Sequence, residues 1–573
     1  MSSTYAHYQG IPGSIPQDYA ILSRSFGQRE LQPPAPTHDI EDEGDEFDPS
    51  SSTPIRRRSS RHGSTNARKE NFLATERTPL LSAPPIPIIE EDVDEGDERN
   101  QARTRTMFWE ELRILTKYAA PVFGTHLLEY SLVMASVVTI GHISTEALAA
   151  ITLGSMTASV SGFSIIQGFA SALDTVLPSA WTSDKPQLVG LWAQRMSHRH
   201  YLGKRGANSA APAPGPEVAR LAALYLRWEL LCLPAYVFNN VSRRYFQSQG
   251  LFDVPTRIIF IVAPLNAVLN YLLVLGPDWI RLGFIGAPIA TAVSINLVTV
   301  LSVIYGVFFA PRTAWHPISR RSFKGLGVLV SLGLAGVGQT ASEWWAWELV
   351  ALAASLLGPV ALATQSILLV SSSTTFQAPF ALSVATAVRI GNLLGEGQAR
   401  RAGVAAKTAV LMALIIGSVF SAMFLIFRNS WGLLFNSDPE VLKMVSAILP
   451  LVALFQVFDG TSAVTGGIFR AKGQQYTGAL LNLTAYYVMG IPIGVWLAFS
   501  FDMALHGLWI GLTLSLVYCA ALGTWFAWRT DWEKEVRKVK ERVREEAGKV
   551  GAVSGGDPEA GDEREPLLNG DTA

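Results

Sequence analysis

Long apolar runs, separated by short polar segments, fill the middle of the chain. A helix that crosses a bilayer needs about 20 mostly apolar residues. The pattern therefore predicts an all-α polytopic membrane protein with eleven spanning helices. These are expected at 115–140, 146–172, 220–243, 256–276, 283–309, 326–356, 360–388, 404–428, 440–468, 475–500 and 506–528. An odd number of crossings would place the two ends of the chain on opposite sides of the membrane.

Basic side chains between the runs predict which loops face the cytosol, because Lys and Arg are enriched on that side. Basic and non-basic loops alternate everywhere except around 220–243, which has basic loops at both ends. One spanning segment is therefore predicted to be missing before this run. The basic loops are 173–216, 243–257, 310–324, 389–407 and 470–472.

An internal repeat identifies the missing segment. "GTHLLEY" at 124–130 matches "GQTASEW" at 338–344 with an offset of 214, whereas "FQSQG" at 246–250 matches "FRAKG" at 469–473 with an offset of 223. The second half thus has nine more residues here, which include its own third helix. Two six-helix lobes are predicted, related by an axis along the membrane normal, with the third helix of the first lobe absent.

In place of that helix the chain has "SHRHYLGKRGANSAAPAPG" at 197–215, which is basic and rich in Ala, Pro and Gly. We predict that this insert is irregular or poorly packed and leaves a gap in the N-terminal lobe. Its composition is typical of a frame-shifted read, so our hypothesis is an alternative or mispredicted splice.

Composition supports the membrane interpretation and divides the chain. Residues are 49% hydrophobic and 16% charged, against about 25% charged in soluble domains. The charged ends lack apolar surface and are predicted to be disordered cytosolic tails. The expected divisions are a tail at 1–110, an N-terminal lobe at 111–310, a cytosolic linker at 311–324, a C-terminal lobe at 325–529 and a tail at 530–573.

Several long motifs resemble the multidrug and toxic compound extrusion (MATE) family, in its eukaryotic, fungal-type form. They include "QGFASALDTVLPSAW" at 167–181, "SEWWAWEL" at 342–349 and "FDGTSAVTGGIFRAKG" at 458–473, and the likeness covers 112–528 except 197–215. The resemblance implies twelve helices in two six-helix lobes around a central cavity. It also implies export of organic, often cationic, compounds in exchange for protons.

Glu343 and Asp459 are the predicted proton-coupling residues. Ionisable groups inside membrane helices are energetically costly and usually face a cavity or a partner. A low-dielectric site disfavours the ionised carboxylate, so such a group can take up a proton and exchange it for a cation. Glu343 matches the family's seventh-helix glutamate and Asp459 its tenth-helix acidic position. The alternative for either residue is a structural ion pair or hydrogen bond.

Four further residues are predicted to bind substrate. Trp347 lies one turn beyond Glu343 and can hold a cation through its ring face. Glu348 is about 140° around the helix from Glu343 but has a family counterpart. Glu129 is aligned with Glu343 by the internal repeat, and a helix–helix hydrogen bond is an equally good alternative role for it. Gln377 is the first residue of the eighth-helix motif.

Other polar residues in the runs are given structural roles. Asp174 and Glu229 lie near helix ends, where solvation makes a charge less costly, and His126 is interpreted as a packing residue.

Both predicted tails contain the pattern E-R-x-P-L-L, which resembles acidic dileucine signals that cytosolic adaptors read for vacuolar delivery. Both copies must face the cytosol to be read, which requires an even number of crossings and again indicates twelve. The key residues are Glu76, Leu80, Leu81, Glu563, Leu567 and Leu568.

The sequence therefore predicts a proton-coupled antiporter that moves organic, cationic compounds out of the cytosol, into the vacuole or else across the plasma membrane. Its partners would be small organic substrates, protons, membrane lipid and sorting adaptors. Two alternatives remain open: a lipid-linked saccharide flippase of the same superfold, and a non-transporting isoform or scaffold, because a helix is missing. No enzyme active site, metal site, cofactor or nucleic-acid partner is indicated.

Overall fold

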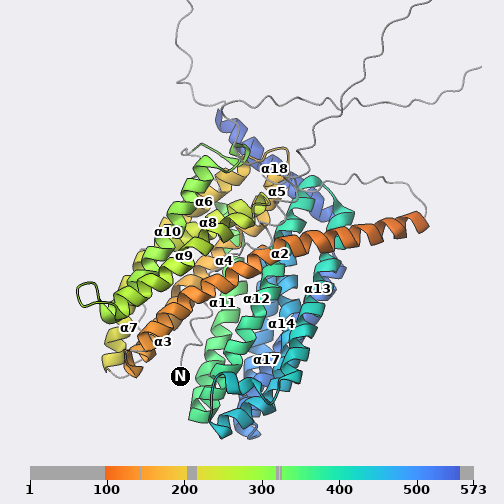
Figure 1. Ribbon diagram of the computed structural model, residues 1–573. Coiled ribbons are helices and arrows are strands. Elements are labelled where there is room, and N and C mark those ends of the chain that lie inside the picture. Colours follow the sequence, from red (N-terminus) through yellow and green to blue (C-terminus); the bar gives the residue numbers. More distant parts are fainter. Residues whose placement is uncertain (1–96, 142, 203–215, 318–321, 323–325, 555–573) are drawn as a thin grey trace, which may run out of the picture. The chain divides into compact units, whose positions relative to one another are not determined.

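A computed structural model describes residues 97–554, except 142, 203–215, 318–321 and 323–325. Over these residues the regular secondary structure is helical (Figure 1). Ten helical segments are long and apolar enough to cross a membrane. The eleventh predicted span corresponds to α11, whose 30 residues extend about 45 Å at 1.5 Å per residue. The all-α membrane fold is confirmed.

The first half of the described chain begins with α2, which contacts helices of both halves. Figure 1 shows α2 crossing obliquely, and it packs on α9 as well as on α12 and α13. The helices of this half are α2 (Asp97–Gly141), α3 (Thr145–Ala158), α4 (Ser164–Ala170), α5 (Leu173–Trp181), α6 (Leu188–Leu202), α7 (Pro216–Glu229), α8 (Leu233–Ser248), α9 (Asp253–Asn270) and α10 (Gly286–Phe308), with π-helical turns at Ser159–Phe163 and Tyr271–Leu275.

The second half contains several long apolar helices, two of which end in glycine caps. Gly397 and Gly473 end α12 and α14 with φ of 86° and 73°, a conformation that favours glycine. The helices are α11 (Gly327–Leu356), α12 (Pro359–Glu396), α13 (Ala399–Ile426), α14 (Pro439–Lys472), α15 (Gln475–Leu483), α16 (Ile491–Ser500), α17 (Ala504–Trp528) and α18 (Trp532–Ser554), with a π-helical segment at Thr484–Gly490.

The helix before the insert is too short to cross a membrane. α6 has 15 residues and spans about 22 Å, whereas the hydrocarbon core is about 30 Å thick. Its counterpart α13 has 28 residues. The start of the insert, 197–202, continues α6 as helix, so the predicted irregular structure is wrong there. Residues 203–215 lie outside the described part.

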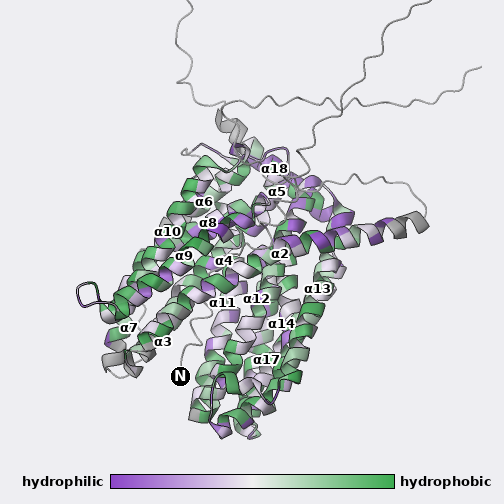
Figure 2. Cartoon of the chain, in the orientation of Figure 1, coloured by the Kyte–Doolittle hydropathy of each residue, from purple (hydrophilic) through white to green (hydrophobic). Residues whose placement is uncertain are grey.

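The predicted disorder at the C-terminal end is wrong for Trp532–Ser554, which form α18. Trp532, Val536, Val539 and Val543 recur at three- or four-residue intervals and pack against a core that includes Leu115. An amphipathic helix of this kind buries its apolar stripe on a neighbour, and the charged composition hid that stripe. Figure 2 shows the polar character of α18 beside the mostly hydrophobic bundle. Likewise, residues 97–110 belong to α2 rather than to a tail.

Close backbone contact joins the two halves where α4 meets α11. Gly168 and Gly336 face each other, and a Cβ atom on either would overlap the backbone of the other helix. These two positions therefore require glycine. α5 also packs on α12, and together these contacts bring polar residues of both halves around one cavity.

Candidate functional site

A cavity lined by residues of both halves lies between them. Helices α2, α5 and α8 contribute to one wall, and α11, α12 and α14 to the other. Its volume is about 160 Å³, counted as space open to the centre of a water-sized sphere. One water needs about 10–15 Å³ by the same measure, so the cavity holds on the order of ten waters.

One face of α11 presents an acidic and aromatic surface to this cavity. Gln339, Glu343 and Trp347 are four residues apart, so they lie above one another on the helix, and all three line the cavity. The Trp347 ring is held by edge-on contacts with Phe455 and Trp509, at centroid distances of 5.6 and 6.0 Å. Two residues predicted from the sequence for proton coupling and substrate binding, Glu343 and Trp347, thus line one cavity.

Asp459 of α14 lines the same cavity and interacts electrostatically with Glu343. Within the described residues, neither carboxyl forms an ion pair within 4 Å. Two carboxylates that share a site repel each other, and a proton or a bound cation relieves that repulsion. This pair can therefore hold positive charge in the cavity.

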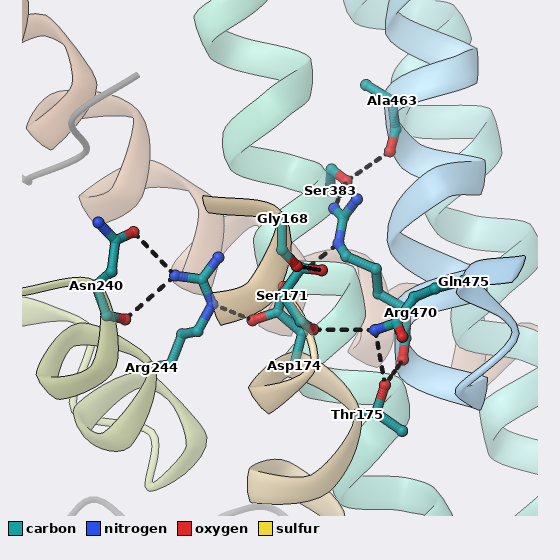
Figure 3. Close-up of polar contacts among 10 residues, drawn as sticks. All are labelled: Gly168, Ser171, Asp174, Thr175, Asn240, Arg244, Ser383, Ala463, Arg470 and Gln475. Atoms are coloured by element: carbon teal, nitrogen blue, oxygen red, sulfur yellow. Dashed lines mark hydrogen bonds and ion pairs between the residues drawn. The ribbon is translucent and has the colours of Figure 1, made fainter. Parts of the chain in front are cut away.

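A second charged cluster joins the two halves (Figure 3). Asp174 of α5 accepts a 2.7 Å hydrogen bond at Oδ1 from Arg244 Nε of α8, and its Oδ2 lies 3.4 Å from Arg470 Nε of α14. Arg244 also donates to the carbonyl and side-chain oxygens of Asn240, and Arg470 donates to Ser383 Oγ at 2.8 Å. One carboxylate thus serves two guanidinium groups.

Neighbouring backbone contacts reinforce this link. The Thr175 hydroxyl donates to the carbonyl of Arg470, and the Gln475 amide donates to the carbonyl of Ser171 at 3.0 Å. Sequence reasoning treated Asp174 as a solvated charge near a helix end, but its oxygens are paired and the side chain is only 14% exposed. No local sequence signal pairs Asp174 with Arg244, which is 70 residues away, or with Arg470 of the other half.

The remaining predicted residues are distributed differently. Gln377 of α12 lines the cavity and donates to the Ser373 carbonyl at 3.1 Å. Glu348 is buried outside the cavity lining, and Glu129 lines a separate, smaller pocket. His126, interpreted as a packing residue, lines the main cavity with its ring 5.0 Å from that of Phe380.

Two other sequence predictions concern residues away from this cavity. Glu229 is buried rather than solvated, and its Oε1 accepts a 3.3 Å hydrogen bond from the Tyr225 hydroxyl. The dileucine patterns at 76–81 and 563–568 lie outside the described residues.

Comparison with known proteins decides the family. The MatE family model matches residues 121–198, 212–272 and 337–496, together more than half of the chain. An uncharacterized transporter of Schizosaccharomyces pombe is 36% identical over 447 residues, which cover 76% of this chain and 83% of that protein. The chain is a member of the MATE family. Because family members are transporters rather than enzymes, the protein is a multi-pass membrane transporter of the multidrug and toxin extrusion type.

Plant and animal MATE proteins match over a similar part of the chain. Protein DETOXIFICATION 16 of Arabidopsis thaliana is 30% identical over 457 residues, covering 76% of this chain and 91% of that one. Multidrug and toxin extrusion protein 1 of Homo sapiens is 28% identical over 451 residues, covering 76% and 77%. The crystal structure of the eukaryotic MATE transporter AtDTX14 superposes with a TM-score of 0.69 at 28% identity, covering 76% of this chain and all of that one.

The family match is interrupted between residues 198 and 212. This interruption falls inside the 197–215 insert and begins within the last residues of the short helix α6. The transporter therefore departs from its family at the position where the loop charges and the repeat offset indicate a missing helix.

Proposed function

We propose that this MATE transporter is a proton-coupled antiporter that exports organic cations from the cytosol. The observation that carries the proposal is the shared placement of Glu343 and Asp459 in one cavity, beside Trp344 and Trp347. The carboxylates supply negative charge, and the indole faces can hold an organic cation through cation–π contact.

Competition for one negative charge couples the two fluxes. When Glu343 is ionised, it attracts a cation that enters from the cytosol. When the cavity opens to an acidic compartment, a proton takes the place of that cation, and the neutral carboxyl no longer retains it. Asp459 is a second acidic group in the site, close enough to Glu343 to interact with it electrostatically.

Transport in proteoliposomes tests this mechanism. With an acidic interior, wild-type protein is expected to accumulate ethidium, whereas Glu343→Gln is expected to abolish accumulation while still eluting as a folded protein. Glu440→Gln is the matched control, because Glu440 is exposed in the first turn of α14. Uptake that follows a sodium gradient and ignores the pH gradient would refute proton coupling.

We also propose the vacuolar membrane as the site of action, on the basis of the two E-R-x-P-L-L patterns at 76–81 and 563–568. Replacing both Leu-Leu pairs by Ala is expected to move a fluorescent fusion from the vacuolar to the plasma membrane. Unchanged vacuolar fluorescence would show that these pairs are not the signal.

A further inference from the structure

The helix α18 contacts both halves of the transporter, although residues 529–531 join it directly to α17 of the second half. It packs on α12 and α13, and it forms an ion pair with α6. These contacts fall at the basic segments 173–216 and 389–407. Because Lys and Arg are enriched in cytosolic loops, α18 lies across the cytosolic ends of helices from both halves.

The first turns of α18 are attached to the second half. Trp532, Val536 and Val539 pack into a core that includes residues of α12, α13 and α14. Glu535 accepts a 3.0 Å hydrogen bond from the amide of Gln474, which lies directly beyond the end of α14. The apolar contacts and the short connection to α17 both hold this part of α18 to the second half.

The last turns of α18 are attached to the first half. Glu546 forms a 2.8 Å ion pair with Arg195 of α6, and both side chains are at most 4% exposed. The guanidinium of Arg195 also lies 4.7 Å from the centre of the Trp192 ring. Val543 packs against the core of α5 and α6 as well as against the core of the second half. The helix therefore changes from one half to the other near Val543.

Transport requires the cavity between the halves to open to the cytosol. In the structure the halves touch on that side, where the Thr175 hydroxyl of α5 donates to the carbonyl of Arg470 of α14. Alternating access separates such ends by moving one half against the other. One helix cannot keep its contacts with two bodies that separate. Since the first turns of α18 are held by the chain connection and the apolar stripe, the last turns are the part that releases α6.

We propose that α18 is a latch, which holds the transporter closed to the cytosol while Glu546 is paired with Arg195. Release of this ion pair and of Val543 lets the cytosolic ends separate. The latch concerns the conformational cycle, so it holds for any substrate or coupling ion. It lies beyond the part of the chain that the family model matches, which ends at residue 496.

Access to the cavity from the cytosol tests the latch without assuming a substrate. Ser373 lines the cavity and is half-buried, so Ser373→Cys places a reporter thiol there. The full-length chain is used, with its two native cysteines, Cys232 and Cys519, replaced by Ser. Sealed microsomes expose the cytosolic face of the membrane. A charged, membrane-impermeant maleimide added outside reaches the thiol only through a cavity that is open to the cytosol, and a gel shift gives the labelling rate.

Glu546→Gln is expected to raise this rate by about tenfold, the scale of a lost charged hydrogen bond. Glu545→Gln is the matched control, because Glu545 is adjacent and exposed, and its rate should stay within about twofold of that of the unmodified latch. Exchanging the two charges, with Arg195→Glu and Glu546→Arg together, restores an ion pair and should bring the rate back down. Val543→Ala keeps both charges and should raise the rate, which provides a second test if Glu546→Gln does not fold.

Three results would overturn the latch. The first is labelling of folded Glu546→Gln and Val543→Ala at the rate of the unmodified latch, since the contact would then not restrain opening. The second is equally fast labelling of Glu545→Gln, and the third is an exchanged pair that labels as fast as Glu546→Gln. None of these rates depends on Glu343 or on ethidium, so a failure of the proposed function would leave the test of the latch intact.

Discussion

At the scale of single residues, Glu111 shows how a buried charge can hold a membrane bundle together. Its carboxylate accepts hydrogen bonds from Arg389 of α12, at 2.8 and 2.6 Å, and from Arg401 of α13, at 2.5 Å. All three side chains are at most 1% exposed. The adjacent Glu110 also bonds Arg401, but it is 38% exposed. Neighbouring glutamates therefore have very different environments.

We predict that Glu111→Gln destabilises the protein by about 3–5 kcal/mol, because it leaves buried arginine charge uncompensated. Glu110→Gln should cost less than about 1 kcal/mol, as expected for a partly exposed pair. The loss of folded protein with temperature, followed by size-exclusion chromatography in detergent, measures both. Equal shifts for the two variants would contradict this assignment.

A second residue-scale prediction separates two glutamates of α11. Glu343 lines the cavity, whereas Glu348 is buried outside its lining. Glu348→Gln is therefore expected to reduce pH-driven ethidium uptake much less than Glu343→Gln. Initial rates in proteoliposomes with matched protein content test this. A larger loss for Glu348→Gln would place the essential carboxyl on the other face of the helix.

At the scale of elements, the contact between α4 and α11 depends on the absence of side chains. We predict that Gly336→Val destabilises the protein by about 1–3 kcal/mol, because the new side chain overlaps Ser171 and the backbone at Gly168. Gly327→Ala is the control on the same helix, since its Cβ would meet no atom within 4 Å. Thermal unfolding in detergent compares the two; a stable Gly336→Val would show that the helices separate without cost.

α18 is the element that composition obscured most. Besides its apolar stripe, it is attached to α6 by the Arg195–Glu546 ion pair at 2.8 Å, with both side chains at most 4% exposed. It is further attached next to α14 by the hydrogen bond from Gln474 to Glu535. These contacts come from both halves of the protein. A charged helix can dock stably when its few apolar residues share one face.

We predict that Val539→Asp releases α18 from the bundle, because it places a charge in an apolar contact. Arg537→Asp, at an exposed position of the same helix, should leave it docked. Thermolysin cleavage within 532–554 reports the difference, with faster cleavage expected only for Val539→Asp. Equal protection of both variants would mean that the polar contacts alone hold the helix.

At the scale of the whole molecule, the two halves are unequal. α13 is long enough to span the membrane, whereas its counterpart α6 is not, and the family match is interrupted at the same place. We predict that transcript sequencing across the codons for residues 190–220 finds a form that encodes about 20 apolar residues here. If every transcript encodes 197–215 as it stands, the splicing hypothesis fails.

The sequence alone determined the membrane class, the order of the spans, the repeat and the departure at the third helix, and its helical period placed Glu343 and Trp347 on one face of α11. Hydropathy, charge alternation and helical period are local properties, so they can be read from neighbouring residues. Only the tertiary structure decided that Asp174 serves two arginines, that Glu111 joins three helices and that α18 docks on the bundle. Those outcomes depend on side chains far apart in the chain, such as Asp174 and Arg244, 70 residues apart. Local pattern carries no information about which of several charges will meet after helices pack.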